Sequence, residues 1–228
     1  MPPQYFEHVI STISGRALSF ITPPEASLPS LQATHAVTVM VVNLYYENPN
    51  VTPERGFGYL IPRSIPLEQN PECALGVVFD SDACVGQDSA SGTKLTVMLG
   101  GHWWDSFDSY PDEEEGAAMA KAVLKRHLKI DEEPVAVRVN LQKECIPQYT
   151  VGFDKRMKAA HGELMRGFKG KLSVAGNSYT GVGLNDCVRA ARDVVKSITG
   201  SPGAGGITGL EQFTSEQRWV RVLTHPKF

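Results

Sequence analysis

Near its C-terminal end the chain contains Lys171-Leu-Ser-Val-Ala-Gly-Asn-Ser-Tyr-Thr-Gly181, and the architecture expected for the rest follows from this segment. Residues 172–175 are small and mostly apolar, which predicts a short buried strand that ends at Gly176. The polar residues up to Gly181 are turn formers and predict a tight loop. After the loop, apolar residues recur with the period of a helix, which Gly200 ends. The expected apolar stripe of this helix comprises Leu184, Cys187, Val188, Ala191, Val194, Val195 and Ile198.

A strand that enters a helix through a glycine-containing loop leaves backbone N–H groups free at the start of the helix. That end of a helix carries roughly half a positive elementary charge. It suits a phosphate, or a carbonyl oxygen that becomes anionic during a reaction. Gly176, Gly181 and Gly183 form neither a G-x-G-x-x-G fingerprint nor a Walker loop. The segment is therefore either an anion-binding unit or a strand–helix unit that only packs in a core.

The composition indicates one large or two small globular domains. The chain has 228 residues, and a hydrophobic content of 42% is enough for a core. The formal net charge of -3 gives no electrostatic basis for binding nucleic acid. No apolar run reaches the ~18 residues needed to span a bilayer, and the first residues resemble neither a signal peptide nor a transit sequence. The cysteines are expected to be free, mostly buried thiols of a reducing compartment, although a bridge between the first two stays open; they are Cys73, Cys84, Cys145 and Cys187.

The central part of the chain contains β-branched and aromatic runs that predict strands. They follow one another with loops rich in turn residues between them, so we expect an antiparallel meander. A further strand candidate covers residues 6–13, and a short helix or loop links it to the meander. The predicted strands of the meander are residues 37–46, 56–62, 75–80, 94–100 and 135–141.

Two more helices are expected between and after these strands. Asp112 opens one of them with acidic residues, and Lys129 lies in its basic last turn, as the helix dipole favours. A compact loop at residues 145–152 precedes the other helix, for which Asp154 is the expected N-cap. Residues 201–228 are expected to form a flexible tail, because the first nine are rich in Gly, Ser and Pro. The face that the second helix is expected to bury comprises Met157, Ala160, His161, Leu164 and Phe168.

The sequence shows no set of residues arranged for acid–base, nucleophilic or metal catalysis. None of the six histidines lies in an H-E-x-x-H motif, so no metal site is predicted. A G-x-S-x-G motif is also absent, and the three glutamates after Asp112 are best explained as a solvated helix start. If the protein is an enzyme, a bound cofactor therefore performs the chemistry.

Four segments resemble the C-terminal half of the eukaryotic protoporphyrinogen oxidase family, and the likeness is to its mitochondrial, fungal forms. They occur in the order of the family and extend over about residues 5–200. The most specific parts are Ile146-Pro-Gln-Tyr149 and Gly181-Val-Gly-Leu-Asn-Asp-Cys187. The four segments are Gly56–Pro62, Leu95–Gly101, Cys145–Gly152 and Ala175–Cys187.

The resemblance implies a flavin amine oxidase fold of class α/β (α+β), with a partial FAD/NAD(P)-binding domain and an antiparallel substrate-domain sheet. It implies FAD-dependent oxidation of protoporphyrinogen IX to protoporphyrin IX by molecular oxygen, in haem biosynthesis. It also implies peripheral association with the mitochondrial inner membrane and a homodimeric state. The expected domains are a partial FAD-binding domain at 1–36, a substrate-binding domain at 37–141, the C-terminal part of the FAD-binding domain at 142–200 and the tail at 201–228.

The resemblance also implies residues that contact the cofactor. Val182, Gly183 and Leu184 match the FAD-contacting helix start of the family, in agreement with the dipole argument. Leu141 or Gln142 lies where the family has a further flavin contact, although many bacterial relatives carry Trp nearby. The alternative for the apolar side chains among these residues is plain packing.

The substrate-binding residues implied by the resemblance are apolar. Phe57, Leu60 and Met98 match residues that enclose the tetrapyrrole, and a flat macrocycle needs such walls. For each of the three, a core side chain is the alternative.

The sequence departs from the family at its front. It contains no G-x-G-x-x-G unit for the ADP part of FAD, no N-terminal arginine for a substrate propionate and no membrane-binding helices. We therefore expect a C-terminal fragment or truncated gene product that is inactive alone. The alternative is a non-catalytic remnant or binding module of the flavin amine oxidase superfamily. Another flavin amine oxidase is a weaker reading, because the Cys145–Tyr149 motif fits the porphyrinogen branch better.

Overall fold

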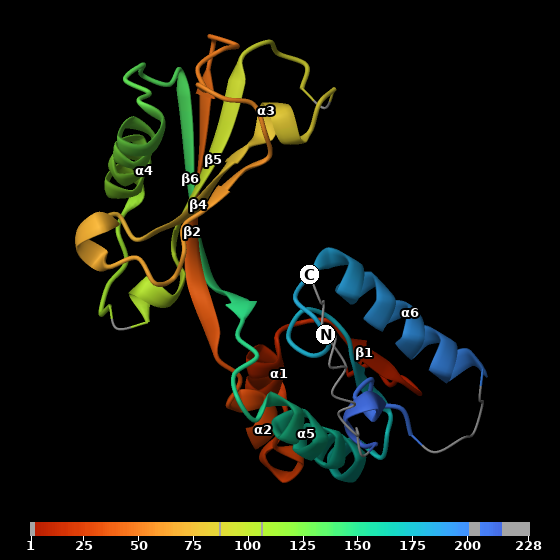
Figure 1. Cartoon of the computed structure of the whole chain (residues 1–228). Helices are drawn as coiled ribbons and strands as arrows, with labels where there is room; N and C mark the ends of the chain where they lie inside the picture. Colours follow the sequence, from red (N-terminus) through yellow and green to blue (C-terminus); the bar gives the residue numbers. More distant parts are fainter. Residues whose placement is uncertain (1–2, 87, 106, 201–205, 216–228) are drawn as a thin grey trace, which may run out of the picture. The chain divides into compact units, whose positions relative to one another are not determined.

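The chain divides into two compact units in the computed structural model (Figure 1). Unit 1 consists of Met1–His35 and Pro147–Phe228, and unit 2 is Ala36–Ile146. Unit 1 is therefore discontinuous in sequence, with unit 2 inserted between its two parts. The structure describes residues 3–86, 88–105, 107–200 and 206–215.

Unit 2 is built on a five-stranded sheet with the strand order β3-β4-β5-β2-β6. β3, β4 and β5 are antiparallel neighbours in sequence order, which confirms the predicted meander for these strands. The meander prediction is wrong for β2, which lies between β5 and β6. β2 is apolar along almost its whole length, and such a strand is best buried at the centre of a sheet. The strands are β2 (Ala36–Tyr46), β3 (Gly58–Leu60), β4 (Ala74–Phe79), β5 (Thr93–Gly100) and β6 (Ala136–Pro147).

β6 is longer than the sequence predicts, because it continues to Pro147 rather than ending at residue 141. The Val135 N–H donates to Tyr45 O, and near the other end the Glu144 N–H donates to Thr38 Oγ1. β6 therefore runs antiparallel to β2. The first residues of the predicted loop at 145–152 belong to this strand, so the prediction of a loop is wrong for them.

One face of the sheet is covered by α4 (Glu113–Leu128), which packs on β2 and β5. Asp112 caps this helix: its carboxylate accepts the Glu115 N–H, and the Glu115 carboxylate accepts the Asp112 N–H. The helix lies close to the sheet because residue 116 is glycine, where a Cβ would stand 2.2 Å from Met40 Sδ. The predicted helix is thus confirmed. The core between this helix and the sheet includes Met40, Val42, Leu44, Leu95, Val97, Leu99, Ala120, Val123 and Leu124.

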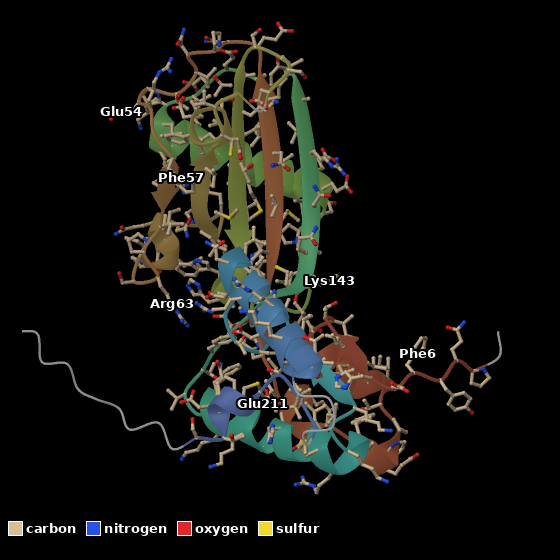
Figure 2. The ribbon with its side chains drawn as sticks, turned by 90° about the vertical axis from the view of Figure 1, so that its right-hand side faces the viewer. Phe6, Glu54, Phe57, Arg63, Lys143 and Glu211 are labelled. Atoms are coloured by element: carbon tan, nitrogen blue, oxygen red, sulfur yellow. The ribbon has the colours of Figure 1, made fainter. Side chains whose placement is uncertain are left out.

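The other face of the sheet, which we call the open face, carries the alternate residues of the same strands. Val41, Thr96 and Met98 are half-buried there, and Asn43 is exposed. In Figure 2 the two edges of the sheet can be followed from Phe57, next to β3, and Lys143, on β6. The remaining short helices of unit 2 are η2 (Leu67–Gln69), α3 (Asp80–Ala83) and η3 (Gly101–Trp104).

Unit 1 is built around a parallel pair of strands, β1 and β7. The pair is short, with Val9 opposite Leu172 and Ser11 opposite Val174, so β1 is shorter than the predicted strand at 6–13. The helices α1, α2 and α5 enclose a separate core that contains Leu31, Met157 and Leu164. The elements are β1 (Val9–Ser11), α1 (Gly15–Ile21), η1 (Pro24–Ala26), α2 (Pro29–Gln32), α5 (Phe153–Phe168), β7 (Leu172–Val174), α6 (Leu184–Gly200) and η4 (Glu211–Phe213).

The start of α5 differs from the prediction. Its N-cap is Gly152, which has a φ of 86°, and the helix begins at Phe153. The predicted N-cap Asp154 is therefore wrong; it lies in the first turn, where its charge still favours the helix dipole. The predicted buried face is confirmed for Met157, Ala160 and Leu164, which are fully buried. The other two predicted residues of this face, His161 and Phe168, are half-buried.

The segment at residues 206–215 packs on unit 1. The Val174 N–H donates to Thr208 O at 2.8 Å, so this segment lies along the edge of β7. Leu210 is fully buried in the core of unit 1. Gly170 and Gly206 approach so closely that a Cβ on Gly170 would stand 1.9 Å from Gly206 Cα. This part of the predicted flexible tail is thus packed, because glycines allow close backbone contact; residues 201–205 and 216–228 lie outside the described residues.

The predicted fold class, α/β (α+β) with an antiparallel sheet, is confirmed. None of the four cysteines forms a disulfide, as predicted, but the prediction that they are mostly buried is wrong: Cys73 is buried, Cys145 and Cys187 are half-buried and Cys84 is exposed. No helix in the described part of the chain is long and apolar enough to cross a membrane. The same residues contain no group of three or more side chains that could hold a metal ion.

Candidate functional site

The loop between β7 and α6 is the strongest candidate for a functional site. β7 and Ala175 are buried, and the loop turns where the Tyr179 N–H donates to Gly176 O. The Tyr179 side chain is also buried, and its hydroxyl donates to Ile13 O at 2.9 Å. The base of the loop is therefore fixed to the segment that follows β1.

Tyr149 holds the two ends of this loop together. Its hydroxyl donates to Asn177 O at 2.7 Å and accepts the Gly181 N–H at 2.8 Å. Its ring stacks on Phe153, with the ring centroids 4.0 Å apart. Burial raises the pKa of Tyr149 to about 12, so the hydroxyl keeps the proton that it donates. A residue of the Ile146–Tyr149 motif thus fixes the shape of the Ala175–Cys187 motif.

Gly181 is required by the geometry at the end of the loop. Its φ is 157°, and a Cβ at this position would stand 2.4 Å from the Asp186 Cβ. Asp186 lies in the first turn of α6, and its carboxylate forms an ion pair with Arg189 one turn further on. The backbone of residues 181–183 therefore passes directly over the start of the helix.

The start of α6 offers backbone donors. The Cys187 N–H donates to Gly183 O at 3.0 Å and makes the first bond of the helix. The N–H groups that precede it have no acceptor within the helix. Val182 is 50% exposed and Leu184 is 80% exposed, so apolar side chains border these donors. This arrangement can bind a flat ligand with a partly negative oxygen.

The residues predicted to contact the cofactor do not all lie in one unit. Val182, Gly183 and Leu184 are adjacent at the start of α6 in unit 1. Leu141 and Gln142 lie on β6 in unit 2, with Leu141 packed against the core and Gln142 exposed. The structure therefore groups the first three and places the other two in a different unit.

Two of the three predicted substrate residues share a row across the open face of the sheet. Leu60 is opposite Gly76, and Gly76 is opposite Met98. Residue 76 has no side chain, and a Cβ there would stand 3.0 Å from Leu60 Cδ2, so the Leu60 side chain lies over the buried Gly76. Leu60 is 77% exposed and Met98 is half-buried. Phe57 precedes β3 and is 74% exposed; Gly58, with a φ of 131°, lies between it and the row.

The apolar residues of α6 form two stripes rather than the single stripe predicted. Cys187, Ala190 and Ile198 are half-buried, and Val194 between them is buried. The exposed stripe comprises Leu184, Val188, Ala191 and Val195. The sequence period identified the helix correctly, but only part of the predicted stripe is covered by unit 1.

Sequence reasoning missed the roles of Tyr149, Tyr179 and Gly76. Tyr149 lies in a recognised motif, but its partners are about 30 residues away in the chain, beyond the reach of any local rule. For Tyr179, an aromatic residue in an otherwise polar turn was an available signal. Gly76 interrupts an apolar strand, which often marks a close approach of another group.

Comparison with known proteins gives a consistent result. The family model for flavin containing amine oxidoreductases matches residues 5–199. The protoporphyrinogen oxidase of Homo sapiens is 37% identical over 201 residues, covering 86% of this chain and 41% of the human protein. That of Schizosaccharomyces pombe is 34% identical over 198 residues, covering 86% and 38%. A solved protein from Exiguobacterium sp. 255-15 has a TM-score of 0.70 at 23% identity and covers 86% of this chain and 42% of its own. The chain thus spans about two fifths of these relatives.

Proposed function

This chain belongs to the flavin-containing amine oxidoreductase family, and we propose that it is the C-terminal portion of a protoporphyrinogen oxidase. In this proposal the cofactor is FAD, the substrate is protoporphyrinogen IX and the final electron acceptor is molecular oxygen. The observation that carries it is the bridge from Tyr149 to both ends of the 177–181 loop. This bridge joins the two motifs through which the sequence resembles that family.

The start of α6 contributes the part of the flavin site that this chain can supply. The flavin, when bound, accepts the hydride that the substrate gives up. The free N–H groups at the helix start and the helix dipole stabilise negative charge on a ring oxygen. Val182 and Leu184 offer apolar contact beside them, and Gly183 leaves the backbone accessible. Leu141 and Gln142 remain proposed as further contacts.

The open face of the unit 2 sheet contributes apolar walls for the substrate. Leu60 and Met98 offer neighbouring apolar surface for one edge of a flat macrocycle, because glycine at position 76 lets the Leu60 side chain lie over the strand between them. Phe57 adds an exposed ring at the same edge of the sheet. These three residues bind and orient the substrate and perform no proton transfer.

The cellular setting is part of the same proposal. The human and Schizosaccharomyces pombe relatives are protoporphyrinogen oxidases, which supports a role in haem biosynthesis. Peripheral association with the mitochondrial inner membrane and a homodimeric state rest on the family resemblance alone.

The test is flavin retention with and without a complementary chain. The chain is mixed with FAD, desalted and examined by visible absorption, alone and after co-expression with the N-terminal part of the human relative that this chain does not match. We expect retention in the co-expressed pair and its loss in Gly181→Ala, with Gly200→Ala as the control. A well-folded pair that retains no flavin would refute the proposal.

A non-catalytic binding module is the second candidate. The same co-expressed pair separates the two candidates. Oxygen-dependent porphyrinogen oxidation by the pair supports the oxidase, and bound flavin without turnover supports the module.

A further inference from the structure

A cavity lies on the open face of the unit 2 sheet. Its volume is about 430 Å³, within the range of small-molecule sites. We call it the distal pocket, and its lining includes Asn43, Tyr45, Asp80, Lys94, Ala136 and Arg138. On β5, Lys94 is four residues from Met98, which corresponds to about 13 Å along a strand. The distal pocket is therefore separate from the proposed porphyrinogen row.

The walls of the distal pocket are largely hydrocarbon. The hydrocarbon comes from the Tyr45 ring, the Ala136 methyl group and the methylene stems of Lys94 and Arg138. Leu44 and Leu95 border the pocket with their backbone, because their side chains lie in the core on the other face. The polar residues come from four elements, β2, α3, β5 and β6, and converge on this one cavity. An apolar cavity with a few convergent polar groups is the usual form of a small-molecule site.

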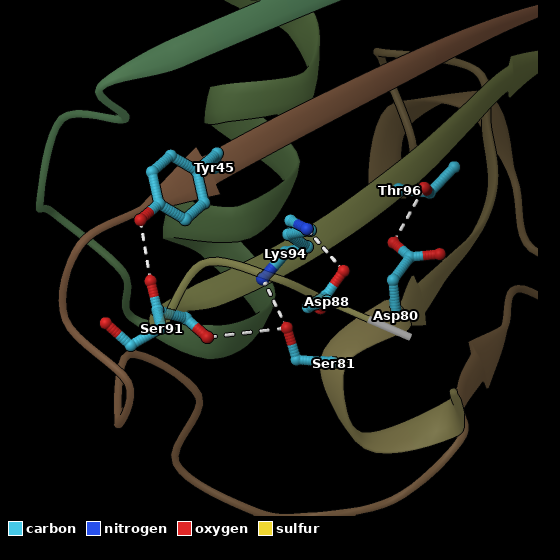
Figure 3. A network of polar contacts seen from close by, with 8 residues as sticks. Tyr45, Asp80, Ser81, Asp88, Ser91, Lys94 and Thr96 are labelled. Atoms are coloured by element: carbon cyan, nitrogen blue, oxygen red, sulfur yellow. Dashed lines mark hydrogen bonds and ion pairs between the residues drawn. The ribbon is translucent and has the colours of Figure 1, made fainter. Parts of the chain in front are cut away.

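Hydrogen bonds position most of the polar groups around the pocket (Figure 3). The Thr96 hydroxyl donates to the Asp80 carboxylate at 2.7 Å. The same hydroxyl accepts from the Asn43 amide at 2.7 Å. The Tyr45 hydroxyl donates to Ser91 O at 2.6 Å. Lys94 forms an ion pair with Asp88. These groups are already fixed before any ligand binds.

Arg138 is the exception. It lies on β6 and is exposed, and its guanidinium has no ion-pair or hydrogen-bond partner among the described residues. A guanidinium offers a planar pair of donors that matches a carboxylate. Asp80 lines the same cavity and would repel a doubly charged group such as phosphate. The charges therefore favour a ligand with one negative charge.

We propose that the distal pocket binds a small apolar carboxylate, with the carboxylate on Arg138 and the hydrocarbon body between β2, β5 and β6. This site goes beyond the proposed oxidase function and depends on neither the flavin nor the porphyrinogen residues. Its ligand class is an aromatic or aliphatic monocarboxylic acid.

The experiment compares two probes of the same shape on the full chain. Binding of 2-naphthoate and its neutral analogue 2-naphthamide is measured by titration calorimetry. We expect 2-naphthoate to bind more tightly, and Arg138→Gln to weaken its binding roughly tenfold or more, as loss of a charge-assisted pair does. The binding of 2-naphthamide should not change. Lys143→Gln is the matched control, because it removes the same charge from the same strand outside the pocket.

A second variant tests the cavity itself. Ala136→Phe fills the pocket from an exposed position on β6 and should weaken both probes. Far-UV circular dichroism checks that each variant is folded. Absence of naphthoate binding, equal affinity for both probes, or equal weakening by Arg138→Gln and Lys143→Gln would each overturn the proposal.

Discussion

Different kinds of contact stabilise the interior of each of the two units. In unit 2, β2 and β5 are paired continuously from Val39–Gly100 to Tyr46–Thr93, and α4 covers one face of the sheet. In unit 1 the parallel pair of β1 and β7 is only three residues long. The shape of the loop that follows β7 depends instead on single side-chain bonds from Tyr149 and Tyr179. Unit 2 is therefore stabilised by many equivalent backbone hydrogen bonds and by its core. The candidate site in unit 1 is stabilised by a few side-chain hydrogen bonds.

The units also differ in how completely they cover their apolar surface. Parallel sheets normally occur with both faces buried. Val9 and Ile10 of β1 are exposed, and so are Val188 and Val195 on α6. In unit 2 the alternate residues of β2 and β5 fill a core under α4. Unit 1, as described, thus presents apolar surface that suits contact with further polypeptide.

The largest expected effect is in the core of unit 2. Leu95→Ala removes a fully buried side chain from the centre of the sheet and should lower the free energy of unfolding by about 2–5 kcal/mol. The exposed Leu60 is the control, and Leu60→Ala should cost less than about 0.5 kcal/mol. Urea unfolding followed by circular dichroism measures both. Equal costs would show that the sheet core does not dominate the stability of unit 2.

The next effect is at the candidate site. Gly181→Ala places a Cβ against Asp186 at an unfavourable φ, and should cost about 1–3 kcal/mol. Flavin retention by the co-expressed pair should fall in parallel, because the loop at the helix start is displaced. The control Gly200→Ala lies where a Cβ meets no other atom within 4 Å, and should leave both quantities unchanged. A Gly181→Ala variant with full stability would contradict the role of this glycine.

The Tyr149 hydroxyl should contribute less to stability than Leu95. Tyr149→Phe removes two hydrogen bonds at a partly exposed position and should cost about 1–2 kcal/mol. Its effect on flavin retention should exceed its effect on unfolding, because the bridge shapes the loop. If retention is unchanged in Tyr149→Phe, the bridge is not needed for the site.

The same tyrosine gives a pH dependence with a definite sign. Burial raises the pKa of Tyr149 from 10.0 to about 12 in the folded protein. Its protonated form is therefore favoured by folding, and this stabilisation is complete below pH 10 and lost as the pH rises through about 12. The free energy of unfolding, measured by urea unfolding at about pH 8 and at about pH 11, should fall less in Tyr149→Phe than in the parent chain. Burial also raises the pKa values of Tyr46, Tyr59 and Tyr179, which still titrate in the variant and contribute to its remaining slope.

The limits of sequence reasoning follow from the same contrast. The strands β2, β4 and β5 were predicted within one or two residues, because alternation of apolar side chains is a local property. The order of the strands in the sheet was not predicted correctly, because the pairing of β2 with β5 joins residues about 50 positions apart in the sequence. For α6, the period predicted the helix but could not say which neighbour covers each apolar residue. The site residues at 182–184 came from family resemblance, while the bridge that shapes them became visible only in three dimensions.

The smallest effect on stability, and the sharpest test of the uncovered surface, comes from α6. Val195→Lys replaces an apolar residue of the exposed stripe of α6 and should change the free energy of unfolding by less than about 0.5 kcal/mol. It should nevertheless reduce aggregation of the isolated chain, because the apolar patch shared with Val188 becomes charged. Size-exclusion chromatography with light scattering at several protein concentrations measures this, and Lys196→Gln, next to it on the helix, is the control. A parent chain that is already monodisperse and melts cooperatively would show that unit 1 needs no further polypeptide to cover this stripe.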